Sequence, residues 1–114
     1  MSNLNDYAYL LEKEIRASGE YGALKQAYEQ VLQNSQAKTL FDDFRNLQLR
    51  LQEKQMSGQP VTEKEAGQAQ AIAAAVQANP LIARLMNAEQ RLSAVLDEVN
   101  KILMKPLEDL YTGK

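Results

Sequence analysis

The chain has 114 residues, a formal net charge of -2, and neither cysteine nor histidine. This length suits one domain and is short for two, so we expect a single domain over residues 1–114. The missing residue types exclude disulfides, thiolate and imidazole metal sites, and Cys/His or Ser/His nucleophiles.

The composition favours helix throughout. There are only 5 glycines and 3 prolines, and alanine, leucine, glutamine, glutamate and lysine dominate. Acidic and basic residues are interspersed and aromatic residues are scarce, which argues against direct nucleic-acid binding. The polar N-terminus does not resemble a signal peptide, and no apolar run approaches the roughly 20 residues of a membrane span. We therefore expect a cytoplasmic protein with no membrane partner.

The first two helices are predicted from apolar spacing. Leu4, Tyr7, Leu11 and Ile15 recur on one face of a helix from about 3 to 17, with Ser2 or Asn3 as its cap. Ser18-Gly19 interrupts this pattern, and Ser18 is placed to cap a second helix. That helix carries an apolar stripe of its own: Tyr21, Leu24, Tyr28, Val31 and Leu32.

A third helix is predicted from about 36 to 55, with Ser35 as its cap and a heptad-like spacing of apolar residues. The loop Ser57–Pro60 follows. Thr62 and Glu65 form a capping box for a fourth helix that ends near Gln77. Val61 and Ala66 are placed as a hydrophobic staple there. This helix is rich in alanine, so we expect it to be clamped closely between neighbouring helices.

Asn79-Pro80 predicts a sharp corner between two helices. Proline cannot continue the fourth helix, but it suits the first position of the next one, with Asn79 as cap. The fifth helix then runs to about Met104, and Pro106 is expected to end or kink it. Leu107, Leu110 and Tyr111 would form a short final turn that folds back.

The third and fifth helices are long for so small a chain, at roughly 30 Å and 37 Å. A compact chain of this size has a radius of gyration of only ~13 Å. Either the two rods pair with each other in an extended hairpin, or they pair with a second chain. We thus predict an all-α fold: an elongated bundle of about five helices that oligomerises through helix packing. The candidate oligomer or partner interface residues are Leu85, Leu92, Val95, Val99, Ile102, Phe44, Leu47 and Leu51.

No pattern indicates an enzyme, a cofactor or a metal site. The adjacent acids Asp42-Asp43, Asp97-Glu98 and Glu108-Asp109 point about 100° apart on a helix and suit solvated faces. Most tyrosines fall at core or interface positions, with Tyr9 as the best candidate for an exposed contact. The arginines that would make a basic patch, if the third and fifth helices lie side by side, are Arg45, Arg50, Arg84 and Arg91.

Three segments carry a resemblance to a known family. They are Ile15-Arg16-Ala17-Ser18-Gly19-Glu20-Tyr21 between Leu11 and Leu24, the pair Phe41 and Phe44, and Asn79-Pro80-Leu81-Ile82 followed by Glu89, Leu92, Val99 and Ile102. In this order and separation they resemble the YlbF/YmcA/YheA family of Firmicute bacteria over nearly the whole chain, with the YheA branch closest.

The resemblance implies an all-helical, bundle-like fold that associates into dimers or higher oligomers. The YlbF and YmcA branches are linked to biofilm formation, competence and sporulation. They act with a third protein on ribonuclease Y, and so on messenger RNA processing. Their cysteines hold iron–sulfur clusters in that complex, and this chain has no cysteine to do so.

Three functional hypotheses follow. The first is a non-catalytic regulatory or scaffold protein that binds itself and a regulatory protein complex through helical faces. The second is a chaperone-like holdase, with Met56, Met86 and Met104 as adaptable contacts. The third is an RNA-binding accessory that uses the four arginines, against which the net charge of -2 already counts.

Overall fold

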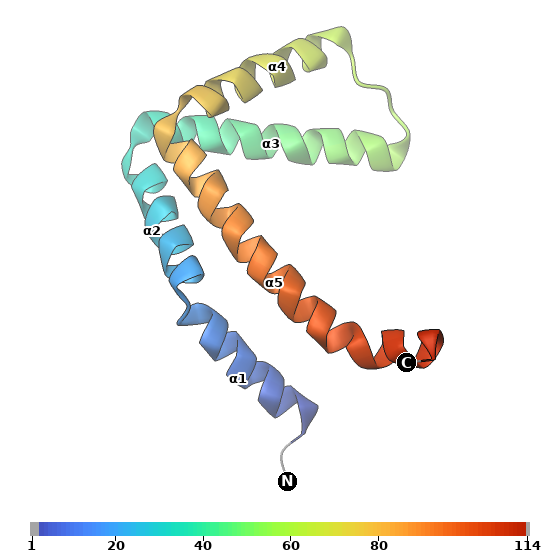
Figure 1. Cartoon of the computed structure of the whole chain (residues 1–114). Helices are drawn as coiled ribbons and strands as arrows, with labels where there is room; N and C mark the ends of the chain where they lie inside the picture. Colours follow the sequence, from blue (N-terminus) through green and yellow to red (C-terminus); the bar gives the residue numbers. More distant parts are fainter. Residues whose placement is uncertain (1–2, 114) are drawn as a thin grey trace. The chain divides into compact units, whose positions relative to one another are not determined.

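The computed structural model describes residues 3–113, and within that range the chain is helical without any β-strand (Figure 1). Its helices are α1 (Leu4–Arg16), α2 (Gly19–Gln33), α3 (Ser35–Ser57), α4 (Glu63–Ala78) and α5 (Pro80–Thr112). α3 has 23 residues and α5 has 33 residues. The predicted all-α fold with two long helices is confirmed.

Capping boxes begin α1 and α4. At α1, the Asn3 side chain accepts a hydrogen bond from the Asp6 N–H at 3.1 Å, and the Asp6 carboxylate accepts one from the Asn3 N–H at 3.3 Å. The predicted box of Thr62 and Glu65 forms in the same way at α4. Ser2, the alternative cap for α1, lies outside the described residues.

The predicted cap of α3 is wrong by one residue. Asn34 caps the helix, because its backbone is extended and its side chain accepts a hydrogen bond from the Ala37 N–H at 2.9 Å. Ser35 is already the first helical residue. Asparagine and serine are comparable caps, so their adjacent positions could not be separated by type alone.

Ser18 joins α1 to α2 as predicted. Its hydroxyl donates to the Ile15 carbonyl at 2.6 Å and accepts from the Tyr21 N–H at 3.2 Å. One side chain thus satisfies backbone groups at the end of α1 and the start of α2.

The α4–α5 corner also forms as predicted. Asn79 has an extended backbone and follows the last residue of α4, and Pro80 is the first residue of α5. The Asn79 side-chain oxygen accepts hydrogen bonds from the N–H groups of Leu81 and Ile82, at 3.0 and 3.1 Å. The corner therefore needs no further loop residue.

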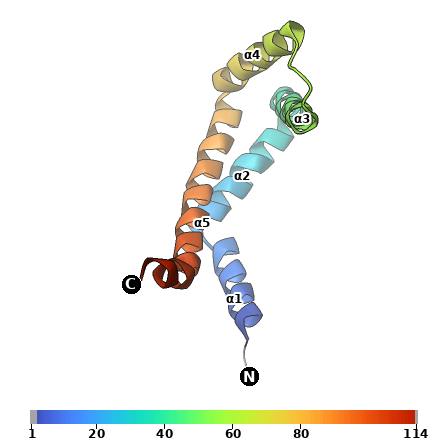
Figure 2. The same cartoon turned by 90° about the vertical axis from the view of Figure 1, so that its right-hand side faces the viewer.

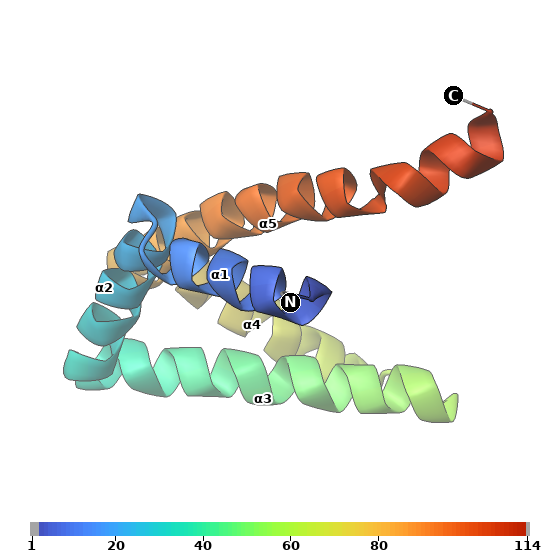
Figure 3. The ribbon, with the colours of Figure 1, turned by 90° about the horizontal axis from the view of Figure 1, so that it is seen from below.

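Pro106 does not end α5. The helix continues through it to Thr112, so the separate final turn predicted for Leu107–Tyr111 is wrong. Figures 1 and 3 show the C-terminal segment changing direction while it stays helical. Proline frees the carbonyl four residues earlier, at Ile102, and this residue is exposed, so water can satisfy that carbonyl.

The chain forms two compact units. One, the hairpin unit, is Lys25–Met86; the other, the terminal unit, comprises the residues up to Leu24 and those from Asn87 onward. In the hairpin unit α4 folds back along α3 after the connecting loop (Figure 1), and Figure 2 views α3 nearly along its axis with α4 to one side. Gly58 ends α3 with φ 73°, a left-handed conformation that suits glycine.

The hairpin unit holds most of the buried apolar side chains among the described residues: Ala27, Val31, Ala37, Leu47, Val76, Ile82 and Leu85. Tyr28 packs edge-on against Phe41, with ring centroids 6.1 Å apart. Lys54 near the end of α3 forms an ion pair with Glu65 near the start of α4. The core and the ion pair together hold α3 against α4.

The predicted clamping of α4 is wrong within this unit. α4 packs on α3, and Val76 is its one buried residue. Alanines on its remaining surface are exposed: Ala71, Ala73, Ala74 and Ala75. Alanine permits a close approach by another helix but does not require one.

The terminal unit contains α1, the start of α2 and most of α5. Its buried apolar side chains among the described residues are Ala88 and Leu92, and α1 contributes none. No helix among residues 3–113 is both long and apolar enough to cross a membrane.

Candidate interaction surfaces

α1 presents a partly exposed apolar face, here called the α1 face: Leu4, Tyr7, Leu11 and Ile15. The side chain of Leu4 is 86% exposed, Tyr7 is also exposed, and Leu11 and Ile15 are half-buried. These residues share one side of the helix because they repeat at three- and four-residue spacing. An amphipathic helix in a folded protein usually buries such a stripe, whereas Leu4 and Tyr7 leave most of their surface exposed.

The second half of α5 presents an exposed apolar stripe, here called the α5 tail face: Leu96, Ile102, Leu103, Leu107 and Leu110. Leu92 is 9% exposed, whereas the five residues of this stripe are 40–76% exposed. The apolar spacing is continuous across this change. The helix therefore extends well beyond the side chains that the chain itself covers.

The predicted interface residues divide into three groups. Leu47, Leu85 and Leu92 are buried in the chain and serve its core. Phe44, Leu51, Val95 and Val99 are half-buried, whereas Ile102 is exposed. Of the eight predicted positions, Ile102 alone lies in a fully uncovered stretch.

Several further apolar residues that were not among the predicted interface candidates are exposed: Leu4, Leu10, Leu103, Leu107 and Leu110. Their helical spacing was visible in the sequence, but spacing alone does not distinguish a covered face from an uncovered one. Tyr9 is 70% exposed, in agreement with its predicted role as an exposed contact. Tyr28 and Tyr111 are exposed as well, so they are not core residues of this chain.

Two of the four arginines contact separate neighbours in the hairpin unit. The Arg45 guanidinium lies 5.8 Å from the centre of the Phe41 ring, and Arg84 donates a hydrogen bond to Gln30 of α2 at 3.0 Å. Arg50 lines a cavity with Asp43, whose carboxylate would repel a phosphate. This arrangement does not favour the RNA-binding hypothesis.

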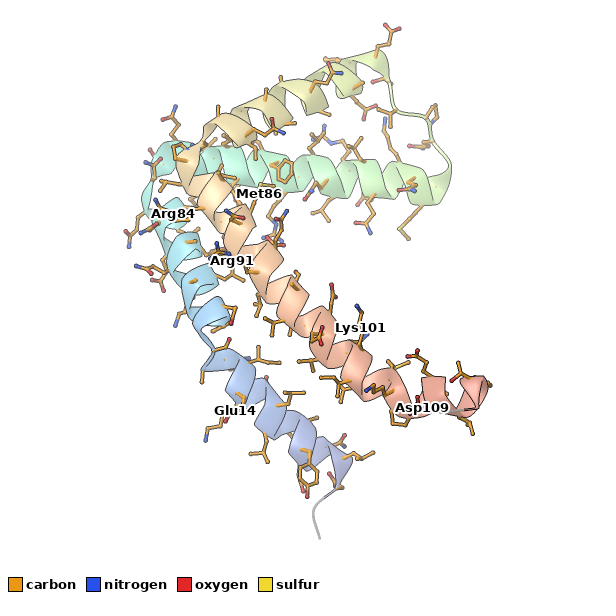
Figure 4. All side chains as sticks on the ribbon, viewed as in Figure 1. Glu14, Arg84, Met86, Arg91, Lys101 and Asp109 are labelled. Atoms are coloured by element: carbon orange, nitrogen blue, oxygen red, sulfur yellow. The ribbon has the colours of Figure 1, made fainter. Side chains whose placement is uncertain are left out.

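The acidic residues do not assemble a metal site. Among residues 3–113 no group of three acidic side chains is placed to hold a metal ion. In the terminal unit the labelled charged side chains Glu14, Lys101 and Asp109 lie well apart (Figure 4). No general acid and base are therefore brought together by these residues.

A polar-rimmed cavity of about 210 Å³ lies between α3 and α4. It is lined by Asp43, Asn46, Leu47, Arg50, Gln68 and Ile72. All six belong to the hairpin unit. Sequence periodicity did not indicate this cavity, because it depends on how two helices far apart in sequence face each other.

Comparison with known proteins places these features in context. The model of the family described as control of competence regulator ComK, YlbF/YmcA, matches residues 4–108. YheA of Bacillus subtilis is 50% identical over 109 residues, which cover 96% of this chain and 93% of that protein.

Solved structures agree with this match. A protein of unknown function (DUF964) from Bacillus stearothermophilus superimposes with a TM-score of 0.86 at 45% identity, covering 95% of each chain. RicA of Bacillus subtilis, solved in complex with RicF, superimposes with a TM-score of 0.70 at 18% identity, covering 95% of this chain and 96% of that one. At that identity the likeness to RicA shows a shared fold alone.

Proposed function

The chain belongs to the YlbF/YmcA family of competence-control regulators, and we propose that it is a non-catalytic regulatory or scaffold protein that acts by binding proteins. It associates with a second copy of itself and with a regulatory protein complex. A role in RNA processing or developmental regulation, as in the better known branches, is part of this proposal.

The observation that carries the proposal is the pair of apolar faces in the terminal unit. The α1 face and the α5 tail face expose large apolar side chains with regular helical spacing. Contiguous exposed apolar patches usually mark sites where another protein binds. Among the described residues, no group of three acidic side chains is placed to hold a metal ion.

A second copy of the chain fits these faces. The two faces hold nine large apolar side chains, of which seven are exposed. A two-fold dimer places the same apolar faces opposite each other and covers both at once.

A relative provides a precedent for a protein partner. RicA was crystallised in complex with RicF, and it shares this fold. The absence of cysteine means that this chain would have to reach a similar complex through side-chain packing, without an iron–sulfur cluster.

The experiment that tests self-association is size-exclusion chromatography with light scattering on a double variant, Leu103→Glu with Leu110→Glu. We expect the wild type to be a dimer or larger and the variant to be monomeric, with helical circular dichroism retained. Leu49→Glu is the matched control, because Leu49 is a comparably exposed leucine on α3, outside both faces. A monomeric wild type, or a variant that associates like the wild type, would refute this part of the proposal.

The regulatory part is tested by affinity capture of the tagged protein at native abundance, with crosslinking and mass spectrometry. We expect crosslinks between copies at the α5 tail face and crosslinks to a second protein of the RNA-processing or developmental machinery. Recovery of this protein alone would contradict the regulatory part of the proposal and would be compatible with self-association only.

A holdase is the second candidate. Met56, on the last turn of α3, and Met104 on α5 are both exposed, although Met86 is half-buried. Exposed methionine adapts to varied apolar surfaces. The test is light scattering of a heat-denatured client at near-stoichiometric ratio, where unchanged aggregation would exclude this activity.

A further inference from the structure

The cavity between α3 and α4, here called the α3–α4 groove, is not part of the two apolar faces. Asp43, Asn46, Leu47 and Arg50 line it from α3, and Gln68 and Ile72 line it from α4. It therefore offers a second surface, on the hairpin unit, whose chemistry differs from that of the terminal unit.

The groove is held open by the residues around it. On one side of it, the Lys54–Glu65 ion pair ties the end of α3 to the start of α4. On the other side, Ala37 and Val76 are buried in the core. Between these two points α4 offers mainly alanine and Ile72, which leave space beside α3 unfilled.

The groove has an apolar floor and a polar rim. Leu47 is buried and Ile72 is half-buried, whereas Asp43, Asn46, Arg50 and Gln68 are exposed. Within residues 3–113 none of these four polar side chains has a hydrogen bond or an ion pair with another residue of the chain. All four are free to bind a ligand.

We propose that the α3–α4 groove binds one helix of a partner protein through a single large apolar side chain flanked by a basic and an acidic residue. The volume of about 210 Å³ suits one leucine- or phenylalanine-sized side chain, because an apolar cavity of about 150 Å³ holds benzene. An apolar anchor in a pocket with a polar rim is the usual arrangement of an interface hot spot.

The spacing of the rim charges is compatible with a helix as the occupant. Asp43 and Arg50 are seven positions apart on α3, which corresponds to about 10.5 Å along the helix axis. A helix lying beside α3 presents its own residues i and i+7 at the same separation, with i+3 or i+4 between them on the same side. The basic residue would pair with Asp43, the acidic one with Arg50, and the anchor would enter between them.

Other ligand classes fit less well. The Asp43 carboxylate disfavours a phosphate backbone, and one carboxylate with two amides is a poor set for a divalent cation. This inference rests on the proposed protein-binding function but uses a different surface, so it can fail while self-association holds.

The test uses the full-length protein and a fluorescein-labelled, lactam-bridged helical peptide. The peptide carries Lys, then Leu four positions later, then Glu three positions after that, on an alanine and glutamine background. Anisotropy should show saturable binding that weakens at least tenfold when the peptide leucine is replaced by alanine. Methyl resonances of Leu47 and Ile72 should shift on titration.

The protein variant Asp43→Lys makes both rim charges positive. We expect it to bind the Lys–Leu–Glu peptide at least tenfold more weakly and a Glu–Leu–Glu peptide more tightly than the wild type. The matched control is Asp42→Lys, which makes the same change of charge at an exposed position that does not line the groove. It should bind both peptides like the wild type.

Three results would overturn the proposal. The first is the absence of saturable peptide binding, including a case where a small aromatic compound binds and the peptide does not. The second is an equal change in peptide affinity for Asp43→Lys and Asp42→Lys, which would show that net charge, not the groove, determines binding. The third is a change of the protein's own oligomeric state in Asp43→Lys alone, which would make a second copy the occupant.

Discussion

At the scale of single residues, Glu65 has more than one role. Its carboxylate accepts hydrogen bonds from the Lys54 ammonium, the Thr62 N–H at 3.1 Å and the Thr62 hydroxyl at 2.9 Å. The Lys54 hydrogen bond, followed by those from Thr62, lowers the pKa of Glu65 from 4.5 to about 2. One side chain thereby caps α4 and ties it to α3.

This lowered pKa predicts a specific pH dependence of stability. Because the pKa of Glu65 is lower in the folded chain than in the unfolded one, its contribution is complete above about pH 4.5 and is lost as the pH falls toward 2. Urea unfolding of wild type and Glu65→Gln should therefore differ most at neutral pH and converge near pH 2. A constant difference between wild type and Glu65→Gln over this pH range would contradict the assignment.

Leu92 and Leu49 differ in burial, so their substitution by alanine should change the free energy of unfolding by different amounts. Leu92 is buried, so Leu92→Ala should lower the free energy of unfolding by about 2–5 kcal/mol. Leu49 is exposed on α3, and Leu49→Ala should change it by less than about 0.5 kcal/mol. Chemical denaturation of both variants at one protein concentration compares these changes. Equal decreases in the free energy of unfolding would contradict the burial of Leu92.

At the scale of helices, the ends of the elements depend on short-range contacts. Five side chains each accept a hydrogen bond from a backbone N–H group within three residues: Asn3, Ser18, Asn34, Thr62 and Asn79. Such contacts depend on neighbouring residues only, which is why most of the helix boundaries could be predicted. Two points could not be fixed in this way: the cap of α3 lies one residue earlier than predicted, and whether Pro106 ends or kinks α5 depends on whether the freed carbonyl meets water or protein.

The α4–α5 corner predicts an order of effects for two neighbouring substitutions. Asn79→Ala removes an acceptor for two N–H groups and should cost about 1 kcal/mol of stability. Pro80→Ala leaves that cap in place and should cost less. Thermal unfolding of both variants tests this order, and a larger loss for Pro80→Ala would show that proline, not asparagine, sets the corner.

At the scale of the whole molecule, the two units differ in how much they bury. The hairpin unit has seven of the buried apolar side chains found among residues 3–113, and the terminal unit has two. A unit with so small a core gains little stability from burial within the chain. Association would supply the missing burial.

Stability should therefore depend on protein concentration. A protein whose folded form is stabilised by association unfolds at a higher temperature as its concentration rises. Circular dichroism melts over a hundredfold range of concentration should show an increasing midpoint for the wild type and a constant midpoint for Leu103→Glu with Leu110→Glu. A constant wild-type midpoint would indicate that the terminal unit is stable alone.

The sequence by itself determined the all-α class, the five helices and nearly all of their caps, because these depend on propensities and contacts within a few residues. It did not separate Leu92 from Ile102, which were both predicted as interface residues on one amphipathic stripe although one is buried and the other exposed. Nor did it indicate the α3–α4 groove, which needs Arg50 and Gln68 from two helices to face one space. Only the tertiary structure decided these points, since cover and cavities arise from residues distant in sequence, and helical periodicity is the same whichever neighbour packs against it.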